Sequence, residues 1–238
     1  MFAWFANPDR FMRLSAWALP LAAAIAALLF VIGAPWALLN SPADFRQGDS
    51  VRIMYIHVPA AFWAMGIYVF MGAASLMGLV WKHALADVAA RAAAPIGAAY
   101  AMLCLVTGSF WGATSWGTWW EWDARLTSML VLFLIYVGYL ALWAAVEDET
   151  RAARLAALLC LGGLINIPIV HFSVDWWNSL HQPSGLMREQ THVSMARPLW
   201  VMVSAFMFAF IALLFAGMRA QVYRRKALAA AARRARAA

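Results

Sequence analysis

The residues with the clearest chemical potential are crowded into one short segment, Trp116-Gly117-Thr118-Trp119-Trp120-Glu121-Trp122-Asp123-Ala124-Arg125. Its four indole rings present broad apolar faces, each with a single N–H donor. Such rings can anchor a protein among lipid headgroups, or they can pack against a large flat ligand. If the segment is helical, one face carries Trp116, Trp119, Trp120 and Asp123 and could lie flat in the membrane interface. Both interpretations of the cluster are open at this level.

Two histidines stand near other aromatic residues. His57 follows Tyr55-Ile56 and precedes Val58-Pro59-Ala60-Ala61, and His181 lies within Trp176-Trp177-Asn178-Ser179-Leu180-His181-Gln182-Pro183. A neutral imidazole is a common axial ligand of heme iron, although a single histidine near a helix end is more often structural. Arg52 and Arg125 are cations that could bind heme propionates, or they could be solvated charges.

The surrounding sequence is that of a membrane protein. Of its 238 residues 65% are hydrophobic and 12% are charged, whereas about a quarter of the residues of a soluble domain are charged. We therefore predict an all-α polytopic fold, residues 1–238, that forms a single integral-membrane domain. Each span needs about 20 apolar residues. The six predicted transmembrane helices are residues 15–36, 58–81, 92–112, 126–146, 155–174 and 198–218, followed by a basic tail at 219–238.

The distribution of lysine and arginine predicts the orientation. With an inner N-terminus, the inner segments hold 13 basic residues and the outer segments hold 5, which together account for all 18. This asymmetry places both termini in the cytoplasm and the tryptophans, His57 and His181 on the outer face. It also explains the net charge of +7 without nucleic acid. The alanine- and arginine-rich tail is expected to extend the last helix along an anionic lipid surface.

The remaining sequence excludes several kinds of site. Cys104 and Cys160 both lie in apolar runs and form no CxxC or CxxCH motif, so a redox pair or covalent heme attachment is not expected. The sequence has no glycine-rich nucleotide loop, so it cannot itself power transport. The acidic residues do not form a convincing catalytic pair, and no catalytic residues are predicted.

Three sequence contexts together resemble a known family. The pattern Trp116-Gly117-x-x-Trp120-x-Trp122-Asp123 has the form of the tryptophan-rich WWD motif of heme-handling proteins, and the contexts of His57 and His181 are similar to the flanking histidines of that family. The short length and six spans are similar to its heme exporter protein C branch, which acts in cytochrome c maturation. The resemblance covers essentially the whole sequence.

The resemblance implies a function in the bacterial inner membrane. Members hold non-covalent heme b at the periplasmic face and transfer it to a periplasmic heme chaperone, beside an ABC transporter subunit pair and a small single-span subunit. By analogy, His57 and His181 are the axial ligands of the heme iron. Trp116, Trp120, Trp122 and Asp123, with Trp119 beside them, belong to the surface that presents heme. An enzymatic role would be limited to assisting bond formation between the chaperone and heme.

Two other function classes are considered. A small-solute permease without heme needs a polar pathway at the membrane midplane, and Asn166, beside Pro168, is a poor candidate for it. An enzyme that forms the heme–cysteine thioether would need a larger extracytoplasmic module than outer loops of about 15 to 25 residues provide. Heme binding and transfer is therefore the favoured prediction.

Overall fold

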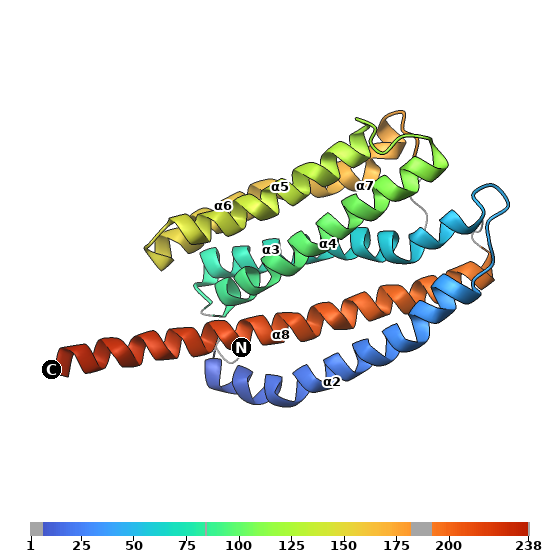
Figure 1. Ribbon diagram of the computed structural model, residues 1–238. Helices are drawn as coiled ribbons and strands as arrows, with labels where there is room; N and C mark the ends of the chain where they lie inside the picture. Colours follow the sequence, from blue (N-terminus) through green and yellow to red (C-terminus); the bar gives the residue numbers. More distant parts are fainter. Residues whose placement is uncertain (1–6, 84, 182–191, 238) are drawn as a thin grey trace.

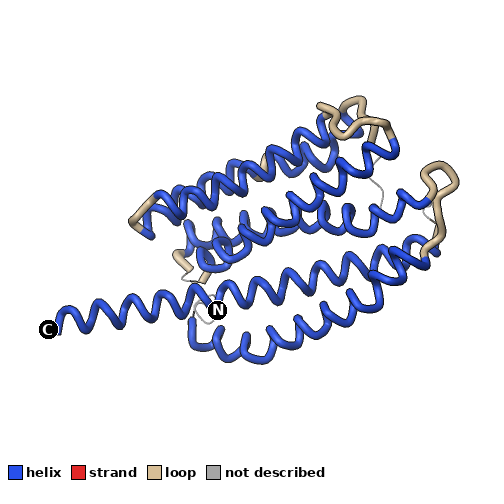
Figure 2. The backbone as a smooth tube through the Cα atoms, viewed as in Figure 1, coloured by secondary structure: helices blue, strands red, loops and turns tan. Residues whose placement is uncertain are grey.

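The computed structural model describes residues 7–83, 85–181 and 192–237, so Gln182 and Pro183 of the second histidine motif lie outside the described residues. The helices run back and forth between two ends of a bundle (Figure 1). Within the described residues, β-structure is limited to one bridge between Asp44 and Gly48, and loops lie at the two ends (Figure 2). The helices are α2 (Pro8–Pro35), α3 (Met54–Trp81), α4 (Ala86–Ser115), α5 (Ala124–Ala145), α6 (Glu149–Gly163), α7 (Asn166–Trp176) and α8 (Val193–Ala237).

The prediction of an all-α fold with six spans is confirmed. Among the described residues, six helical segments are long and apolar enough to cross a membrane. Side-chain caps begin three of them: Asn7 accepts from the Asp9 amide at 2.9 Å, Asp123 from the Leu126 amide at 2.8 Å, and Asp148 from the Arg151 amide at 2.6 Å. Such caps satisfy amides that have no partner within the helix.

The fifth span differs from the predicted continuous helix at 155–174. It is broken into α6 and α7, and the amide of Ile165 donates to the carbonyl of Gly162 at 3.4 Å in a tightened turn. Pro168 has no amide proton and therefore cannot continue the regular ladder. The side chain of Asn166 is buried and donates to the carbonyl of Ser128 at 2.9 Å. Asn166 thus ties α7 to α5, which is a structural role.

The last span is longer than the predicted 198–218. Helix α8 continues to Ala237 and projects beyond the bundle (Figure 1), so the basic tail is helical as expected. Its alanines and arginines are strong helix formers, which is consistent with a helix that persists after its contacts with the bundle end.

The tryptophan segment is not helical, so the face that a helix would give to Trp116, Trp119, Trp120 and Asp123 does not form. Helix α4 ends at Ser115, and Gly117 has a φ of +78°. A positive φ is costly for residues other than glycine and turns the backbone out of the helix. The segment then runs without regular structure to Asp123, where α5 begins.

Polar aromatic side chains join the helices in the bundle. The hydroxyl of Tyr68 in α3 donates to the carbonyl of Cys160 in α6 at 3.0 Å, and that of Tyr136 in α5 donates to Ala64 in α3 at 2.8 Å. Trp63 Nε1 donates to the carbonyl of Val203 in α8 at 2.8 Å. In an apolar environment an unpaired donor is costly, so these bonds fix how the helices lie against each other.

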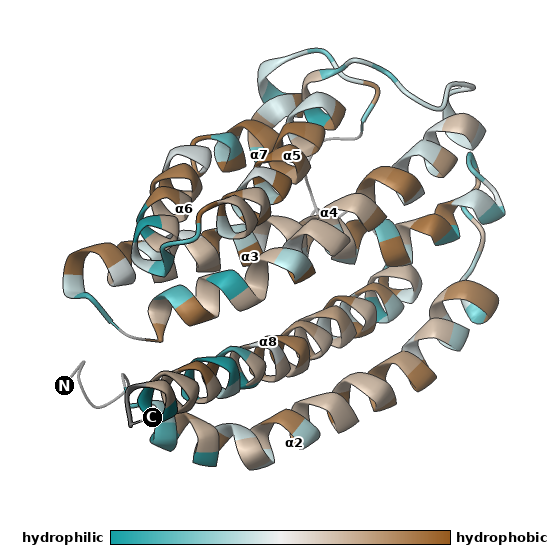
Figure 3. Cartoon of the chain, turned by 60° about the vertical axis from the view of Figure 1, so that its left-hand side comes forward, coloured by the Kyte–Doolittle hydropathy of each residue, from teal (hydrophilic) through white to brown (hydrophobic). Residues whose placement is uncertain are grey.

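The two ends of the bundle have different contents. One end, here named the histidine end, contains the first turns of α3, the loop 116–123 and the loop 177–181 (Figure 1). The other, named the tail end, contains the start of α2, the end of α3, the start of α4 and the C-terminal part of α8. Hydrophilic residues gather in the loops and around the C-terminal part of α8, while the helices between are largely apolar (Figure 3). The first and last described residues, Asn7 and Ala237, both lie at the tail end.

Candidate functional site

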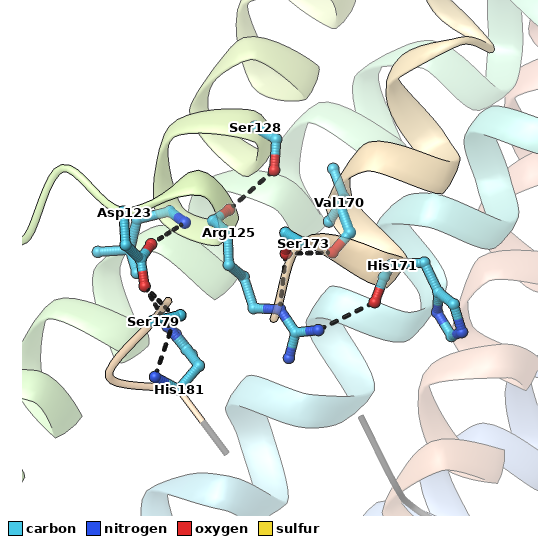
Figure 4. A network of polar contacts seen from close by, with 9 residues as sticks. Asp123, Arg125, Ser128, Val170, His171, Ser173, Ser179 and His181 are labelled. Atoms are coloured by element: carbon cyan, nitrogen blue, oxygen red, sulfur yellow. Dashed lines mark hydrogen bonds and ion pairs between the residues drawn. The ribbon is translucent and has the colours of Figure 1, made fainter. Parts of the chain in front are cut away.

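His181 is held by Asp123, although 57 residues separate them in the sequence. Its Nδ1–H donates to Asp123 Oδ2 at 3.0 Å. The hydroxyl of Ser179 donates to the same carboxylate oxygen, and the His181 amide donates to Ser179 Oγ at 3.1 Å. The other oxygen of Asp123 caps α5 through Leu126. One buried carboxylate therefore fixes both the start of α5 and the orientation of the His181 ring (Figure 4).

The surroundings of His181 and Asp123 determine which of the two groups is charged. Burial lowers the pKa of His181 below its ordinary value of 6.5, and the adjacent Asp123 offsets only part of that effect. Burial also opposes ionisation of Asp123, but hydrogen bonds from Ser179, Leu126 and His181 outweigh it and hold the pKa of Asp123 below 3.8. At neutral pH the imidazole is therefore neutral and the carboxylate is charged. A neutral imidazole is the form that binds iron.

His57 lies in the first turns of α3 and faces the last part of α4. Its Nδ1–H donates to the carbonyl of Cys104 at 3.0 Å, with Thr107 Oγ1 at 3.3 Å. Gly108 makes room for the ring, because a Cβ at that position would lie 2.8 Å from His57 Cε1. Trp111 packs edge-on to the imidazole with ring centroids 5.7 Å apart. The ring is thus constrained on the Nδ1 side and by an indole.

The two histidines share one tautomer. A carbonyl and a carboxylate can only accept hydrogen bonds, so the contact with Cys104 requires a proton on Nδ1 of His57, and the contact with ionised Asp123 requires one on Nδ1 of His181. Each ring then presents the lone pair of Nε2. Metal-ligating histidines characteristically donate their second nitrogen to such oxygen atoms, which fixes the tautomer and the ring orientation.

The structure brings His57, His181 and Arg125 into one neighbourhood. His181 and Arg125 both act electrostatically on His57, and Arg125 also acts on His181. Arg125 Nε donates to Ser173 Oγ at 3.3 Å, and its terminal nitrogen donates to the carbonyl of His171 at 3.0 Å (Figure 4). A guanidinium beside the two imidazoles gives the site a cation suited to a carboxylate or another anionic ligand group.

Arg52 is engaged elsewhere at the histidine end. Its two terminal nitrogens donate to the carbonyls of Leu38 at 3.2 Å and Ser41 at 3.0 Å. The guanidinium also lies 3.2 Å from the carboxylate of Asp49. These contacts tie the end of the first span to the start of α3, which is a structural function. The Nε of Arg52 is buried without a partner among the described residues, and propionate binding by Arg52 stays a prediction.

The tryptophans of the loop differ in their surroundings. Trp116 packs edge-on to His181 with ring centroids 4.7 Å apart. Trp120 packs against Trp122 at 5.4 Å, and its Nε1 is buried with no acceptor in the part of the chain that the structure describes. Trp119 and Trp122 are 60% and 74% exposed. The loop thus combines one indole at a histidine with two indoles open to the surroundings.

The structure adds residues that the sequence did not single out. Ser179 bridges Asp123 and His181, Thr107 lies at His57, and Gln47 accepts from Trp111 Nε1 at 2.7 Å. For Ser179 a signal was present, since a hydroxyl two residues before a histidine can bond its backbone amide. Thr107 and Gln47 come from distant segments and carry no local signal.

The sequence is similar to characterised proteins over nearly its whole length. A family profile described as Heme exporter protein C matches residues 1–233. The protein of that name from Bradyrhizobium diazoefficiens is 54% identical over 224 residues, which cover 93% of this chain and 85% of the relative. The protein of that name from Escherichia coli K12 is 48% identical over 194 residues, which cover 82% of this chain and 79% of the relative. That from Paracoccus denitrificans is 43% identical over 237 residues, covering 98% of each.

Proposed function

This chain belongs to the heme exporter protein C family, and on that premise we propose that it binds heme at its histidine end and transfers it to a periplasmic heme chaperone during cytochrome c maturation. The supporting observation is the shared tautomer of His57 and His181, each with Nδ1 donating and Nε2 available. Two neutral imidazoles are exchangeable ligands of heme iron. A carrier needs such ligands because it must release what it binds.

The residues of the site fit a heme b molecule in their chemistry. His57 and His181 would be the axial ligands, and Arg125 would neutralise a propionate. The buried Nε1 of Trp120 is a donor that lacks an acceptor among the described residues, and a heme carboxylate could satisfy it. Trp116, beside His181, would contact the porphyrin, and the exposed Trp119 and Trp122 would lie toward the chaperone.

The proposed setting follows from the charge distribution. The tail end carries most of the basic residues, so it would face the cytoplasm of a bacterial inner membrane and the histidine end would face the periplasm. The names of the relatives support membership of a heme export complex. We infer that an ABC transporter subunit pair and a small single-span subunit complete it.

A visible spectrum of the detergent-purified protein tests the proposal. We expect a Soret band with the α and β bands of a six-coordinate low-spin heme after reduction. His181→Ala should abolish or severely weaken the band, and His57→Ala should shift or weaken it. His192→Ala is the matched control, because His192 is exposed and its ring bonds only to Ser194 among the residues that the structure describes. Unchanged spectra in both site variants would rule out axial ligation by this pair.

A further inference from the structure

The tail end holds a pocket that the heme proposal does not use. Its volume is about 460 Å³, and it lies between the start of α2, the start of α4 and the C-terminal part of α8. Pro8, Leu85 and Val222 contribute to an apolar wall. Its cationic wall is formed by Arg225, Lys226 and Arg233 of α8.

The cations of this pocket keep solvent-exposed side chains, although two of them already pair with carboxylates. Lys226 Nζ lies 2.7 Å from Asp9, and Arg225 Nε lies 3.7 Å from Glu149. Arg233 forms no ion pair with any residue that the structure describes, and its Nε contacts only the carbonyl of Ala229, at 3.4 Å. The side chains of Arg225 and Lys226 remain 38% and 55% exposed. An additional anion can therefore reach all three cations.

The backbone adds to the positive potential. Helix α4 begins at Ala86 beside the pocket, and its preceding residue, Leu85, provides no side-chain cap. The N-terminal end of a helix carries a partial positive charge that favours anions. The acidic residues Asp9, Asp87 and Glu149 are the opposing charges nearby, and Asp9 and Glu149 already face basic partners.

We propose that this pocket binds an anionic phospholipid, with the phosphate on the cationic wall and the upper part of an acyl chain on the apolar wall. The pocket lies where the membrane-spanning helices end, at the surface that an anionic leaflet would cover. A free phosphate ion would use only the cationic wall and would leave the apolar wall in water. An amphiphile with an anionic head satisfies both walls.

The test is thermal unfolding of the full-length protein in a neutral detergent, with added lipid. Dioleoylphosphatidylglycerol should raise the midpoint in a saturable manner. Dioleoylphosphatidylcholine and inorganic phosphate should not. The double variant Arg225→Gln/Arg233→Gln should weaken the response to phosphatidylglycerol by about ten-fold or more, since each basic residue near an anionic surface contributes roughly 1 kcal/mol.

Arg224→Gln/Arg234→Gln is the matched control, because it removes the same charge one position earlier and one position later on α8, away from the residues that line the pocket. Arg233→Gln alone is a second variant that breaks no ion pair among the described residues, should the double variant fail to fold. Equal loss in both double variants would mean diffuse surface charge and would overturn the proposal. Protection by phosphate alone, or equally by phosphatidylcholine, would overturn it as well.

Discussion

Asp123 Oδ2 lies 3.0 Å from His181 Nδ1, while the other oxygen of the same carboxylate caps α5. The segment 177–181 is thereby locked to the tryptophan loop. The carboxylate makes Nε2 the accessible nitrogen and increases its basicity as a ligand. Asp123 is therefore a positioning residue for the proposed iron ligand rather than a ligand itself.

Asp123→Asn should weaken heme binding without unfolding the bundle. Asparagine caps helices nearly as well as aspartate, so α5 should begin at the same place. The loss of the charged acceptor should lower heme affinity by about 10- to 100-fold, as is typical for outer-shell partners of metal-binding histidines. Heme titration followed by the Soret band measures this change.

Glu121→Gln is the control for this substitution. Glu121 is exposed and lies two residues before Asp123 in the same loop. The substitution therefore removes the same charge without changing a partner of His181. If both variants bind heme as the unaltered protein does, Asp123 does not position the ligand.

The pH dependence of heme binding follows from the pKa of His181. Protons compete with iron for the imidazole, and burial holds the pKa of His181 in the folded protein below 6.5. The Soret band should therefore persist at pH 6.5 and be lost on further acidification. Because Asp123 raises the pKa of His181, Asp123→Asn should lower the pKa of this imidazole in the heme-free protein. An NMR pH titration of the His181 ring in the two heme-free proteins compares these pKa values, and a higher pKa in the variant would contradict this role.

The stability of the folded protein should also fall as the pH is lowered. The unfolded state takes up the His181 proton at a higher pH than the folded state, because the folded pKa is depressed. Stability from this group is complete above about pH 6.5 and declines as the pH falls. The depressed pKa of Asp123 adds a further loss at lower pH, below its ordinary value of 3.8.

The sequence was sufficient for the spans but not for the site. Continuous apolar runs predict membrane helices because a lipid-exposed backbone must bond within itself. The break before Asn166 was not foreseen, since its cause is partly the bond to Ser128, 38 residues away. Likewise, the position of Asp123 just before an apolar run is typical of a helix cap, but its bond to His181 depends on how α5 and α7 pack. Short-range patterns report local structure, whereas side-chain pairs across helices depend on tertiary packing.

Gly108→Ala should disturb the His57 side of the site. The added Cβ would lie 2.8 Å from His57 Cε1 and 3.2 Å from Nδ1, so the ring must move away from Cys104 and change its approach to iron. We expect a shifted or weakened Soret band with about 1–3 kcal/mol lost in stability. Gly138→Ala is the control, since its nearest neighbour, Leu159 Cδ2, would lie at an ordinary 3.5 Å. Identical spectra for both variants would place His57 outside the coordination of heme.

The break between α6 and α7 offers a paired test of packing. A Cβ on Gly163 would clash with the hydroxyl of Tyr68 and lie 3.1 Å from Ile135 Cγ2. Gly163→Ala should therefore cost about 1–3 kcal/mol. Gly162→Ala meets no atom within 4 Å and should be neutral or stabilise by up to about 1 kcal/mol. Thermal unfolding in detergent compares the two, and equal midpoints would mean that α3 and α6 do not pack as closely as described.

The tryptophans should separate heme binding from heme transfer. Trp116 packs against His181, whereas Trp122 is 74% exposed and packs against Trp120. Trp116→Ala should lower heme affinity, because it removes the indole packed against the proposed ligand. Trp122→Ala should leave the Soret band nearly intact and slow the passage of heme to the periplasmic chaperone.

The measurement is the rate at which purified chaperone acquires heme from the preloaded protein. Trp17→Ala is the control for loss of an exposed indole, because Trp17 is 59% exposed and lies on α2, remote from the loop. A Trp122→Ala protein that delivers heme at the unaltered rate would mean that the exposed rim of the loop does not take part in transfer. A Trp122→Ala protein that no longer binds heme would instead place this indole at the porphyrin.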